Sequence, residues 1–227
     1  MGIAERKERE KTERKALILE CAKDLISTMG TEKVSMTDIA QKAELSKATL
    51  YLYFPSKELL FRELSETEQG KFISLFQSRL KPNLSALETI HLFWESYVDI
   101  YRDSDGWMIL FNIRHYVGDD FLFLSDSMKN HFVIYTMLQE TIEKGIAEGT
   151  MDPSVDSAAA ARAALYLFSY IVENSTRLPG DKKKGRLVTK EIKKIFEIII
   201  RGIARPGVDP SLLVLSDPPE EKAARTR

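Results

Sequence analysis

The chain has 227 residues, of which 44% are hydrophobic, enough for one large globular domain or two smaller ones. Its formal net charge of −1 excludes a bulk attraction to nucleic acid, so any DNA site must be a local patch. A single cysteine, Cys21, excludes an intrachain disulfide and a zinc site built from cysteines.

Two stretches bear on export and membrane insertion. Residues 3–15 alternate acidic and basic side chains and lack the apolar core of a secretory signal. The longest apolar run, residues 158–172, contains Arg162 and is shorter than the roughly 18–20 uncharged residues of a membrane span. We therefore expect no transmembrane segment, no membrane partner and a location in the reducing cytoplasm.

The first predicted helix covers residues 8–29, where apolar side chains recur at helical spacing and Gly30 provides the stop. A solvated face with i,i+4 ion pairs is the favoured interpretation of the charged run at its front end, and an arm near DNA phosphates is the alternative. The basic residues of this run are Arg6, Lys7, Arg9, Lys11, Arg14 and Lys15, mixed with glutamates.

Two short helices follow, separated by a three-residue turn. Ser35 is placed to cap a helix that starts at Met36 and runs to Ala43, and Asp38 completes a capping box. The turn, residues 44–46, has the length that joins the two helices of a helix-turn-helix. Ser46 then caps the next helix.

The helix after Ser46 divides into a buried side and an outer side. Leu50 and Phe54 lie four residues apart and share one side. Lysine reaches guanine acceptors in a major groove, and hydroxyls reach phosphates. We hypothesise that this helix reads double-stranded DNA with the polar residues of its outer side, Lys47, Thr49, Tyr51 and Tyr53.

The rest of the chain is also predicted to be helical, which makes the fold all-α. Residues 206–227 are predicted to form a tail with little structure of its own, although 212–215 could dock onto the body. Hydrophobic periodicity and breaker residues predict helices over residues 56–80, 85–102, 107–117, 125–148, 155–177 and 187–204.

Several motifs in a fixed order resemble the DNA-binding domain of the tetracycline-repressor (TetR) family of bacterial transcriptional regulators. They are SMTDIA at 35–40, AELS at 43–46, KATLYLYF at 47–54 and SKELL at 56–60. The resemblance implies a helix-turn-helix domain over residues 1–56, a ligand-binding and dimerisation domain over 57–205 and a tail over 206–227.

The resemblance also implies roles for individual residues. Thr37 corresponds to a phosphate contact at a helix N-terminus, and Lys47 and Ala48 correspond to base-reading positions. Residues that clamp the sugar-phosphate backbone or a base edge are Thr49, Tyr51 and Tyr53, with Lys57 as a further phosphate ligand. Thr49 could instead support the helix cap, and Lys57 could be an ordinary solvated lysine.

Glu44 stands in the turn where the family often has glycine. A positive φ at this position would cost on the order of 1 kcal/mol, and the carboxylate would repel a nearby phosphate. The operator affinity therefore depends on how this turn is accommodated.

Bulky residues are concentrated between Trp94 and Tyr170. Core packing is the favoured role for any single one, but as a set they suit a cavity for a lipophilic or aromatic effector. The resemblance implies such a pocket. Its candidate residues are Trp94, Tyr97, Phe111, Arg114, His115, Phe132, Tyr135, Tyr166 and Tyr170.

The last two long helices carry alanines and isoleucines on more than one face. A terminal helix that is apolar on two sides requires a second surface, which a second copy of the chain supplies most simply. The family dimerises in the same place. We predict a homodimer interface that includes Ala161, Leu165, Ile195, Ile199 and Ile203.

The histidines are scattered without metal-ligand spacing, so we expect no metal and no cofactor. The sequence is interpreted as a repressor that binds a near-palindromic operator as a dimer and is released by a small ligand. It is not expected to be an enzyme. Two alternatives are a helical-bundle enzyme that uses Cys21 or His115, and a ligand-binding module without DNA recognition.

Overall fold

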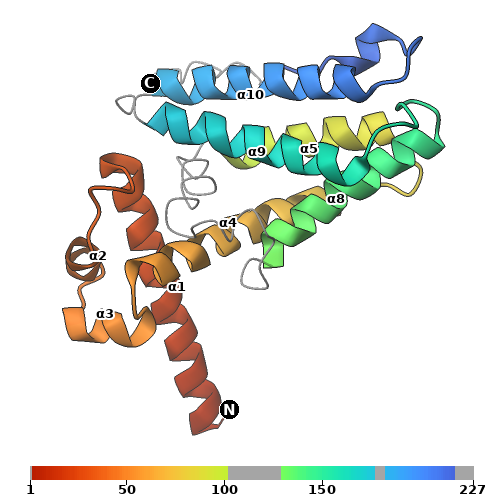
Figure 1. The fold of residues 1–227 in the computed structure, drawn as a ribbon. Helices are drawn as coiled ribbons and strands as arrows, with labels where there is room; N and C mark the ends of the chain where they lie inside the picture. The colour runs from red at the N-terminus through yellow and green to blue at the C-terminus, as the bar shows by residue number, and fades with distance from the viewer. Residues whose placement is uncertain (1, 102–128, 177–181, 218–227) are drawn as a thin grey trace, which may run out of the picture.

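A computed structural model of the chain describes residues 2–101, 129–176 and 182–217. The described elements are helical, which confirms the predicted all-α fold, and the predicted helix over 107–117 lies outside the described residues (Figure 1). The helices are α1 (Ile3–Met29), α2 (Met36–Lys42), α3 (Lys47–Tyr53), α4 (Lys57–Arg79), α5 (Ala86–Tyr101), α8 (Lys129–Ala147), α9 (Ser157–Thr176), α10 (Lys182–Ile203) and the 3₁₀ helix η2 (Pro210–Leu213).

The N-terminal helices form a small unit around their own core. Helices α1, α2 and α3 lie together at one end of the molecule, and α4 leads from them into the body (Figure 1). The first half of α4 belongs to this unit, because Leu60, Phe61 and Leu64 are buried with Ile18 and Leu50. Burial of these apolar side chains provides the main stabilisation of the unit.

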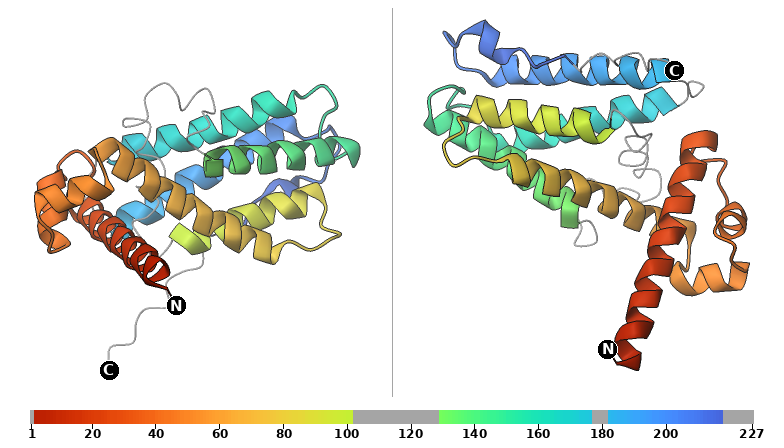
Figure 2. Two further views of the ribbon diagram at one scale, coloured as in Figure 1. Left: turned by 90° about the horizontal axis from the view of Figure 1, so that it is seen from below. Right: turned by 180° about the vertical axis from the view of Figure 1, so that it is seen from behind.

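The body surrounds a second core that is rich in aromatic rings. Phe93 of α5 lies edge-on to Phe72 of α4, with ring centroids 4.8 Å apart, and stacks on Phe196 of α10 at 6.2 Å. Helix α9 contacts both α8 and α10, and α8 contacts α4 and α5 (Figure 2). The body is therefore a helix bundle held by large apolar side chains.

Polar contacts join α4 to both units. The Glu68 side chain of α4 is 3% exposed and pairs with Lys23 of α1 at 3.1 Å and with Lys71 at 2.7 Å. Two residues earlier, Glu66 accepts a hydrogen bond at 3.0 Å from the backbone N–H of Asn130, the second residue of α8. Helix α4 is thus tied to the N-terminal unit through Lys23 and to α8 through Asn130.

The segment after α10 packs onto the body, so the prediction of a tail with little structure is wrong for its first part. Leu213 and Leu215 are buried in the body core, which confirms that this stretch docks. The Trp94 indole N–H donates to the Ser216 carbonyl at 2.9 Å, and the backbone N–H of Leu215 donates to Glu197 at 2.9 Å. We call residues 208–217 the C-terminal strap.

Two helices begin earlier than predicted, α1 at Ile3 and α10 at Lys182. In α1 the extension is supported by the i,i+4 ion pair Arg6–Glu10, at 2.8 Å, and a second such pair one turn on. Within the described parts of the chain, no helix is long and apolar enough to cross a bilayer.

Candidate nucleic-acid interface

Helix α2 begins with a complete capping box. The Ser35 hydroxyl accepts from the backbone N–H of Asp38 at 3.2 Å, and the Asp38 carboxylate accepts from the backbone N–H of Ser35 at 2.9 Å. The hydrogen bonds from Ser35 hold the pKa of Asp38 below its usual range. Thr37 follows at the second position of α2 and is exposed, as a phosphate contact requires.

The turn between α2 and α3 contains a residue in the left-handed region. Glu44 has φ 54°, the only positive φ of a non-glycine residue in the described chain. The turn is fixed nonetheless, because the backbone N–H of Leu45 donates to the Ala40 carbonyl at 2.9 Å and Ala43 is buried. The predicted strain at Glu44 is therefore present, and its carboxylate is exposed to solvent.

Helix α3 starts at Lys47 with Ser46 as its cap, as predicted. The Ser46 hydroxyl accepts from the backbone N–H of Thr49 at 3.0 Å and lies 2.7 Å from the Thr49 hydroxyl. Leu50 and Phe54 anchor the helix in the core, with 0% and 2% exposure. The Thr49 hydroxyl thus supports the cap in this structure, the alternative that the sequence left open.

The outer face of α3 combines charge, a phenol and one apolar side chain. Lys47 and Ala48 are exposed, and Tyr51 is 41% exposed. Leu52 is 85% exposed, although leucine is normally buried. Sequence reasoning missed Leu52, yet its spacing of four residues from Ala48 places both on one face.

Lys57 has a contact that neither sequence interpretation anticipated. Its ammonium donates to the Thr31 carbonyl at 2.9 Å and lies 5.2 Å from the centre of the Phe61 ring. Burial lowers the pKa of the Lys57 ammonium. Lys57 thereby ties the start of α4 to the loop after α1.

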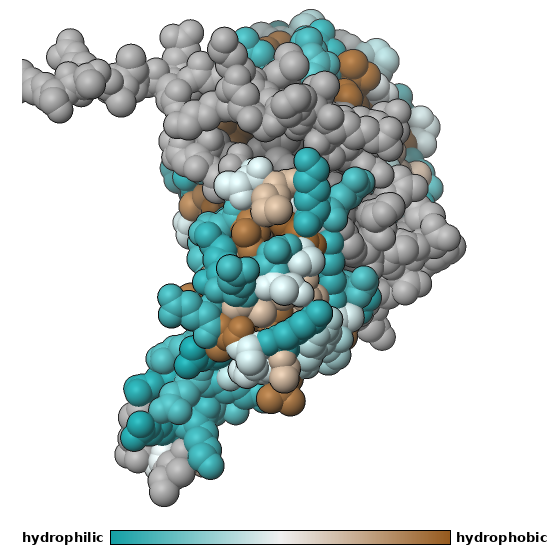
Figure 3. All heavy atoms as spheres, turned by 90° about the vertical axis from the view of Figure 1, so that its left-hand side faces the viewer, coloured by the Kyte–Doolittle hydropathy of each residue, from teal (hydrophilic) through white to brown (hydrophobic). Residues whose placement is uncertain are grey.

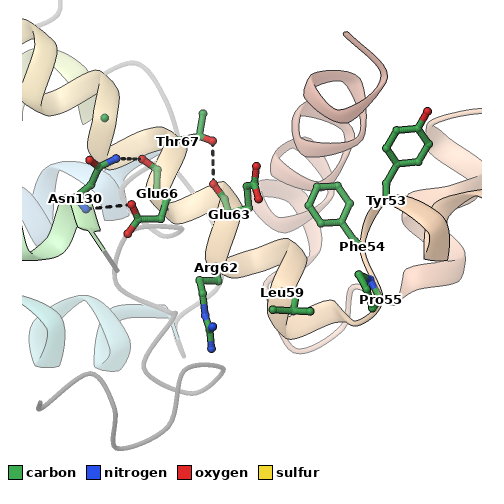
Figure 4. A pocket seen from close by; sticks show the side chains of 10 residues that line it. Tyr53, Phe54, Pro55, Leu59, Arg62, Glu63, Glu66, Thr67 and Asn130 are labelled. Carbon is green, nitrogen blue, oxygen red and sulfur yellow. Dashed lines mark hydrogen bonds between the residues drawn. The ribbon is translucent and has the colours of Figure 1, made fainter. Parts of the chain in front are cut away.

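A groove of about 580 Å³ lies between the end of α3, one face of α4 and the start of α8 (Figure 4). Burial raises the pKa of Glu66 on its wall. The Asn130 amide nitrogen donates to the Glu66 carbonyl at 2.7 Å, as the dashed lines of Figure 4 show. The residues that line the groove are Tyr53, Phe54, Pro55, Leu59, Arg62, Glu63, Glu66, Thr67, Gly70 and Asn130.

The predicted effector residues have different environments. Trp94, Tyr97 and Tyr135 are buried in the body core, where burial strongly raises the pKa of Tyr97. Phe132 is 50% exposed, and Tyr166 is half-buried. The remaining candidates, Phe111, Arg114, His115 and the side chain of Tyr170, lie outside the described residues.

One of the predicted dimer residues is placed in the subunit core instead. Ala161 has 0% exposure in the single chain, so its side chain packs within the subunit and presents no surface to a partner. Leu165 and Ile203 pack partly against the core, and Ile195 and Ile199 are half-buried. The same two helices expose Ile198 of α10 (66%) and Leu167 of α9 (40%).

The candidates for other chemistry have ordinary structural environments where they are described. Cys21 is buried, and burial raises the pKa of its thiol, which disfavours the nucleophilic thiolate. The His91 ring nitrogen Nε2 lies 3.1 Å from the Leu212 carbonyl at the strap. Among the described residues no group of three His, Cys, Asp or Glu side chains could hold a metal ion.

Comparison with known proteins gives the same DNA-binding architecture. Residues 18–64 match the family model "Bacterial regulatory proteins, tetR family". An uncharacterized HTH-type transcriptional regulator of Bacillus subtilis, YvdT, is 30% identical over 169 residues, which are 70% of this chain and 78% of that protein. The fatty acid metabolism regulator protein of Bacillus subtilis is 22% identical, covering 82% of this chain and 93% of that protein.

Among solved structures, the fatty acid degradation regulator FadR from Bacillus halodurans aligns with a TM-score of 0.63. The alignment covers 83% of this chain and 95% of FadR at 17% identity, a likeness of fold alone. TetR-family regulators bind DNA and small-molecule effectors, typically as dimers. The family model, the relative at 30% identity and the capped helix-turn-helix agree, and the chain belongs to the tetR family of bacterial transcriptional regulators.

Proposed function

We propose that this regulator is a repressor that binds a near-palindromic operator as a homodimer and is released by a small lipophilic or aromatic effector. The observation that carries the DNA-binding part is the division of α3. Leu50 and Phe54 are buried, while Lys47, Ala48 and Leu52 are exposed on a helix with a fixed cap. A rigid, exposed helix face of this size suits a major groove.

Within this proposal the reading face has three members. The Lys47 ammonium donates to guanine O6 or N7, and the small Ala48 allows the helix to approach the base edges closely. Leu52, on the same face as Ala48, contacts a thymine methyl group, which is the apolar feature of the major groove. The operator half-site is therefore expected to contain both a G·C pair and a T·A pair.

The other predicted DNA residues position the helix on the backbone. Thr37, at the start of α2, and Tyr51, on the outer side of α3, are exposed and donate to phosphate oxygens in this proposal. Thr49 and Tyr53 are half-buried and contact the backbone at the edges of the interface. Lys57 adds positive charge near the phosphates while it remains bonded to Thr31.

Selection of binding sites from a random duplex library tests this assignment directly. Wild-type protein is expected to enrich a two-fold symmetric sequence, and Lys47→Ala is expected to lose discrimination at one base pair per half-site, about 1–3 kcal/mol. Lys81→Ala is the matched control, because Lys81 is an exposed lysine in the α4–α5 connection. Unchanged base preference in Lys47→Ala would contradict the assigned reading face.

The homodimer is proposed to form through α9 and α10. Ile198 is 66% exposed and Leu167 is 40% exposed, and such apolar surface on adjacent helices favours burial against a second copy. Ile198→Asp is expected to give a monomer in sedimentation velocity. Leu80→Asp, a change of the same chemistry at a 43% exposed position after α4, is the control and is expected to stay dimeric.

The effector is proposed to be lipophilic because the body is rich in aromatic side chains. Two relatives are named as regulators of fatty acid metabolism or degradation, and these names describe those proteins. A thermal-shift screen with fatty acids, acyl-coenzyme A esters and aromatic compounds tests the class. A true effector raises the melting temperature and releases the selected operator, whereas a compound that only raises the melting temperature does not act as an inducer.

A further inference from the structure

The first three turns of α1 project from the rest of the protein. Side chains at positions 4–14 are all exposed, and packing begins only at Lys15, which pairs with Glu63 and lies 5.4 Å from the centre of the Phe54 ring. Figures 1 and 2 show this end of α1 extending past α3, away from the body. At 1.5 Å per residue, the stretch from Ile3 to Lys15 spans about 18 Å.

A projecting helix without packing contacts is stabilised here by ion pairs along its surface. Arg6 pairs with Glu10 at 2.8 Å, and Arg9 pairs with Glu13 at 3.5 Å. These pairs use two of the basic residues and two of the acidic ones. In Figure 3 this end of the molecule, at the bottom of the view, is hydrophilic over the surface that is coloured.

Three other basic residues of the projection form a stripe. Lys7, Lys11 and Arg14 are spaced by four and three residues, which places them on one face of the helix. None of the three has an ion-pair partner among the residues that the structure describes. Glu10 lies at the edge of the stripe, but its carboxylate is bound by Arg6.

The direction of the stripe follows from the packed part of α1. Four residues after Arg14 on the same face is Ile18, which is fully buried in the core shared with α2, α3 and α4. The stripe therefore points to the side of α1 on which α2, α3 and α4 are packed. The stripe therefore lies on the same side of the protein as the exposed face of α3, beyond the packed part of the unit.

We propose that Lys7, Lys11 and Arg14 bind the phosphate backbone of DNA next to the half-site that α3 reads. The positive charge of the stripe complements the negative charge of DNA phosphates, and the stripe lies on the same side of the protein as the exposed face of α3. The inference rests on the proposed DNA-binding function. Phosphate contacts of this kind add affinity and fix orientation without reading sequence. They lengthen the footprint of each subunit beyond the recognition helix.

The test compares two variants of equal charge in the same helix segment. K7Q/K11Q removes two stripe residues, and R6Q/R9Q removes two residues that are already paired with glutamates. All four positions are exposed, and glutamine keeps the helix propensity close to that of lysine and arginine. Matching circular dichroism spectra and melting temperatures of the full-length variants establish that the fold is kept.

Binding is measured by fluorescence anisotropy with a labelled 40-bp random-sequence duplex in 50–200 mM NaCl. The plot of the log association constant against log salt concentration has a negative slope. Its magnitude is expected to decrease by about 0.9 for each lost phosphate contact, so by about 1.8 per bound subunit for K7Q/K11Q. R6Q/R9Q is expected to keep the wild-type slope. R6Q/R9Q also frees the carboxylates of Glu10 and Glu13, which can only weaken DNA binding. A larger loss in K7Q/K11Q than in this control therefore cannot be explained by the unpaired carboxylates.

Each other outcome overturns the proposal. Wild-type slopes in both variants would make the projection a solvated helix that does not touch DNA, and equal losses in both would indicate long-range charge instead of contacts. Wild-type protein that does not bind the duplex at 50 mM NaCl would refute the proposed DNA-binding function itself, and this inference with it. If only the proposal about the stripe is wrong, the wild-type protein still binds the duplex, so this result differs from a failure of the proposed DNA-binding function.

Discussion

The two hydrophobic cores of this regulator are assembled by contacts of very different sequence range. In the N-terminal unit of α1, α2, α3 and the first half of α4, each helix start is fixed by a residue three positions away, as in the pairs Ser35–Asp38 and Ser46–Thr49. In the body, the Trp94 indole binds a carbonyl 122 residues further along the chain. The first core is thus specified by local sequence, whereas the second depends on segments that meet only after folding.

This difference predicts that the two units can be destabilised separately, and the largest effect is expected at Leu50. Leu50 is fully buried between α3 and the other N-terminal helices, so Leu50→Ala should cost about 2–5 kcal/mol. Trp94 of α5 is buried in the body core, so its fluorescence reports the body. We expect an early unfolding transition by circular dichroism that tryptophan fluorescence does not follow.

Leu52→Ala provides the matched control for this experiment. Leu52 lies two residues from Leu50 but is 85% exposed, so its truncation should change stability by less than about 0.5 kcal/mol. If Leu50→Ala shifted both probes together, the units would unfold as one cooperative body. The ion pair between Lys23 of α1 and Glu68 of α4 would then couple the two units more strongly than their separate cores suggest.

A truncation in the C-terminal strap is expected to destabilise the body, as Leu50→Ala destabilises the N-terminal unit. Leu215 is 1% exposed within the body core, and because the strap can relax around a cavity, Leu215→Ala should cost about 2–3 kcal/mol. The indole of Trp94 is bonded to the neighbouring Ser216, so its emission should shift on unfolding of the strap. Leu212→Ala, at a 51% exposed position in the same strap, should leave both the emission and the stability unchanged.

The local elements were predictable because their determinants are neighbours in sequence. Ser35, Asp38 and Ser46 allowed the starts of α2 and α3 to be predicted to within one residue. The strap was only partly predicted, since the pattern of 212–215 shows apolar side chains but not the Trp94 surface that receives them. Ala161 was misplaced for a related reason: small residues allow close helix packing, but do not distinguish a partner helix within the subunit from one across a dimer.

The proposed DNA-reading face was predictable from the sequence in outline, but not in each of its residues. Lys47 and Ala48 came from the motif, whereas Leu52 was overlooked because an apolar residue in a short helix is usually assigned to the core. The contact between Lys57 and Thr31 joins residues 26 positions apart, so it could not be predicted from the sequence around either residue. Contacts across the turn regions therefore need the structure, even in the unit that local sequence specifies best.

A pH titration distinguishes the units further, because the body contains a buried histidine. Burial lowers the pKa of His131 in α8 to about 4, below the ordinary value of 6.5 expected in the unfolded chain. The unfolded state therefore binds more protons between these values, and stability falls as the pH falls from 6.5 towards 4. The loss is expected to reach at most about 1.4 kcal/mol per pH unit.

Urea unfolding followed by tryptophan fluorescence at pH 7, 6 and 5 measures this dependence. His131→Gln removes the titrating group and should flatten the curve relative to wild type, whatever its effect on absolute stability. His91→Gln is the control, because His91 lies at the strap and is only partly buried. Equal pH dependence in wild type and His131→Gln would show that folding does not lower the pKa of His131.

The smallest expected effect on stability lies at Glu44, the residue of the N-terminal unit whose backbone conformation favours glycine. The φ of 54° costs a side-chain-bearing residue about 1–2 kcal/mol, and glycine loses about 0.5–1 kcal/mol of this gain through its flexible unfolded state. Glu44→Gly should therefore stabilise the protein by at most about 1.5 kcal/mol, as measured by urea unfolding. Glu44→Ala keeps the strained φ and removes only the carboxylate, so its stability should stay at the wild-type value or below it.

The same two variants separate geometry from charge in DNA binding. If the exposed carboxylate of Glu44 repels a phosphate, both variants should bind DNA more tightly than wild type, and the gain should shrink as salt is added. If only the glycine variant binds more tightly, the strain in the turn holds α3 away from its best position. If neither changes the affinity, Glu44 lies away from the DNA, and its positive φ is a cost that the buried Ala43 and the Leu45–Ala40 hydrogen bond are sufficient to offset.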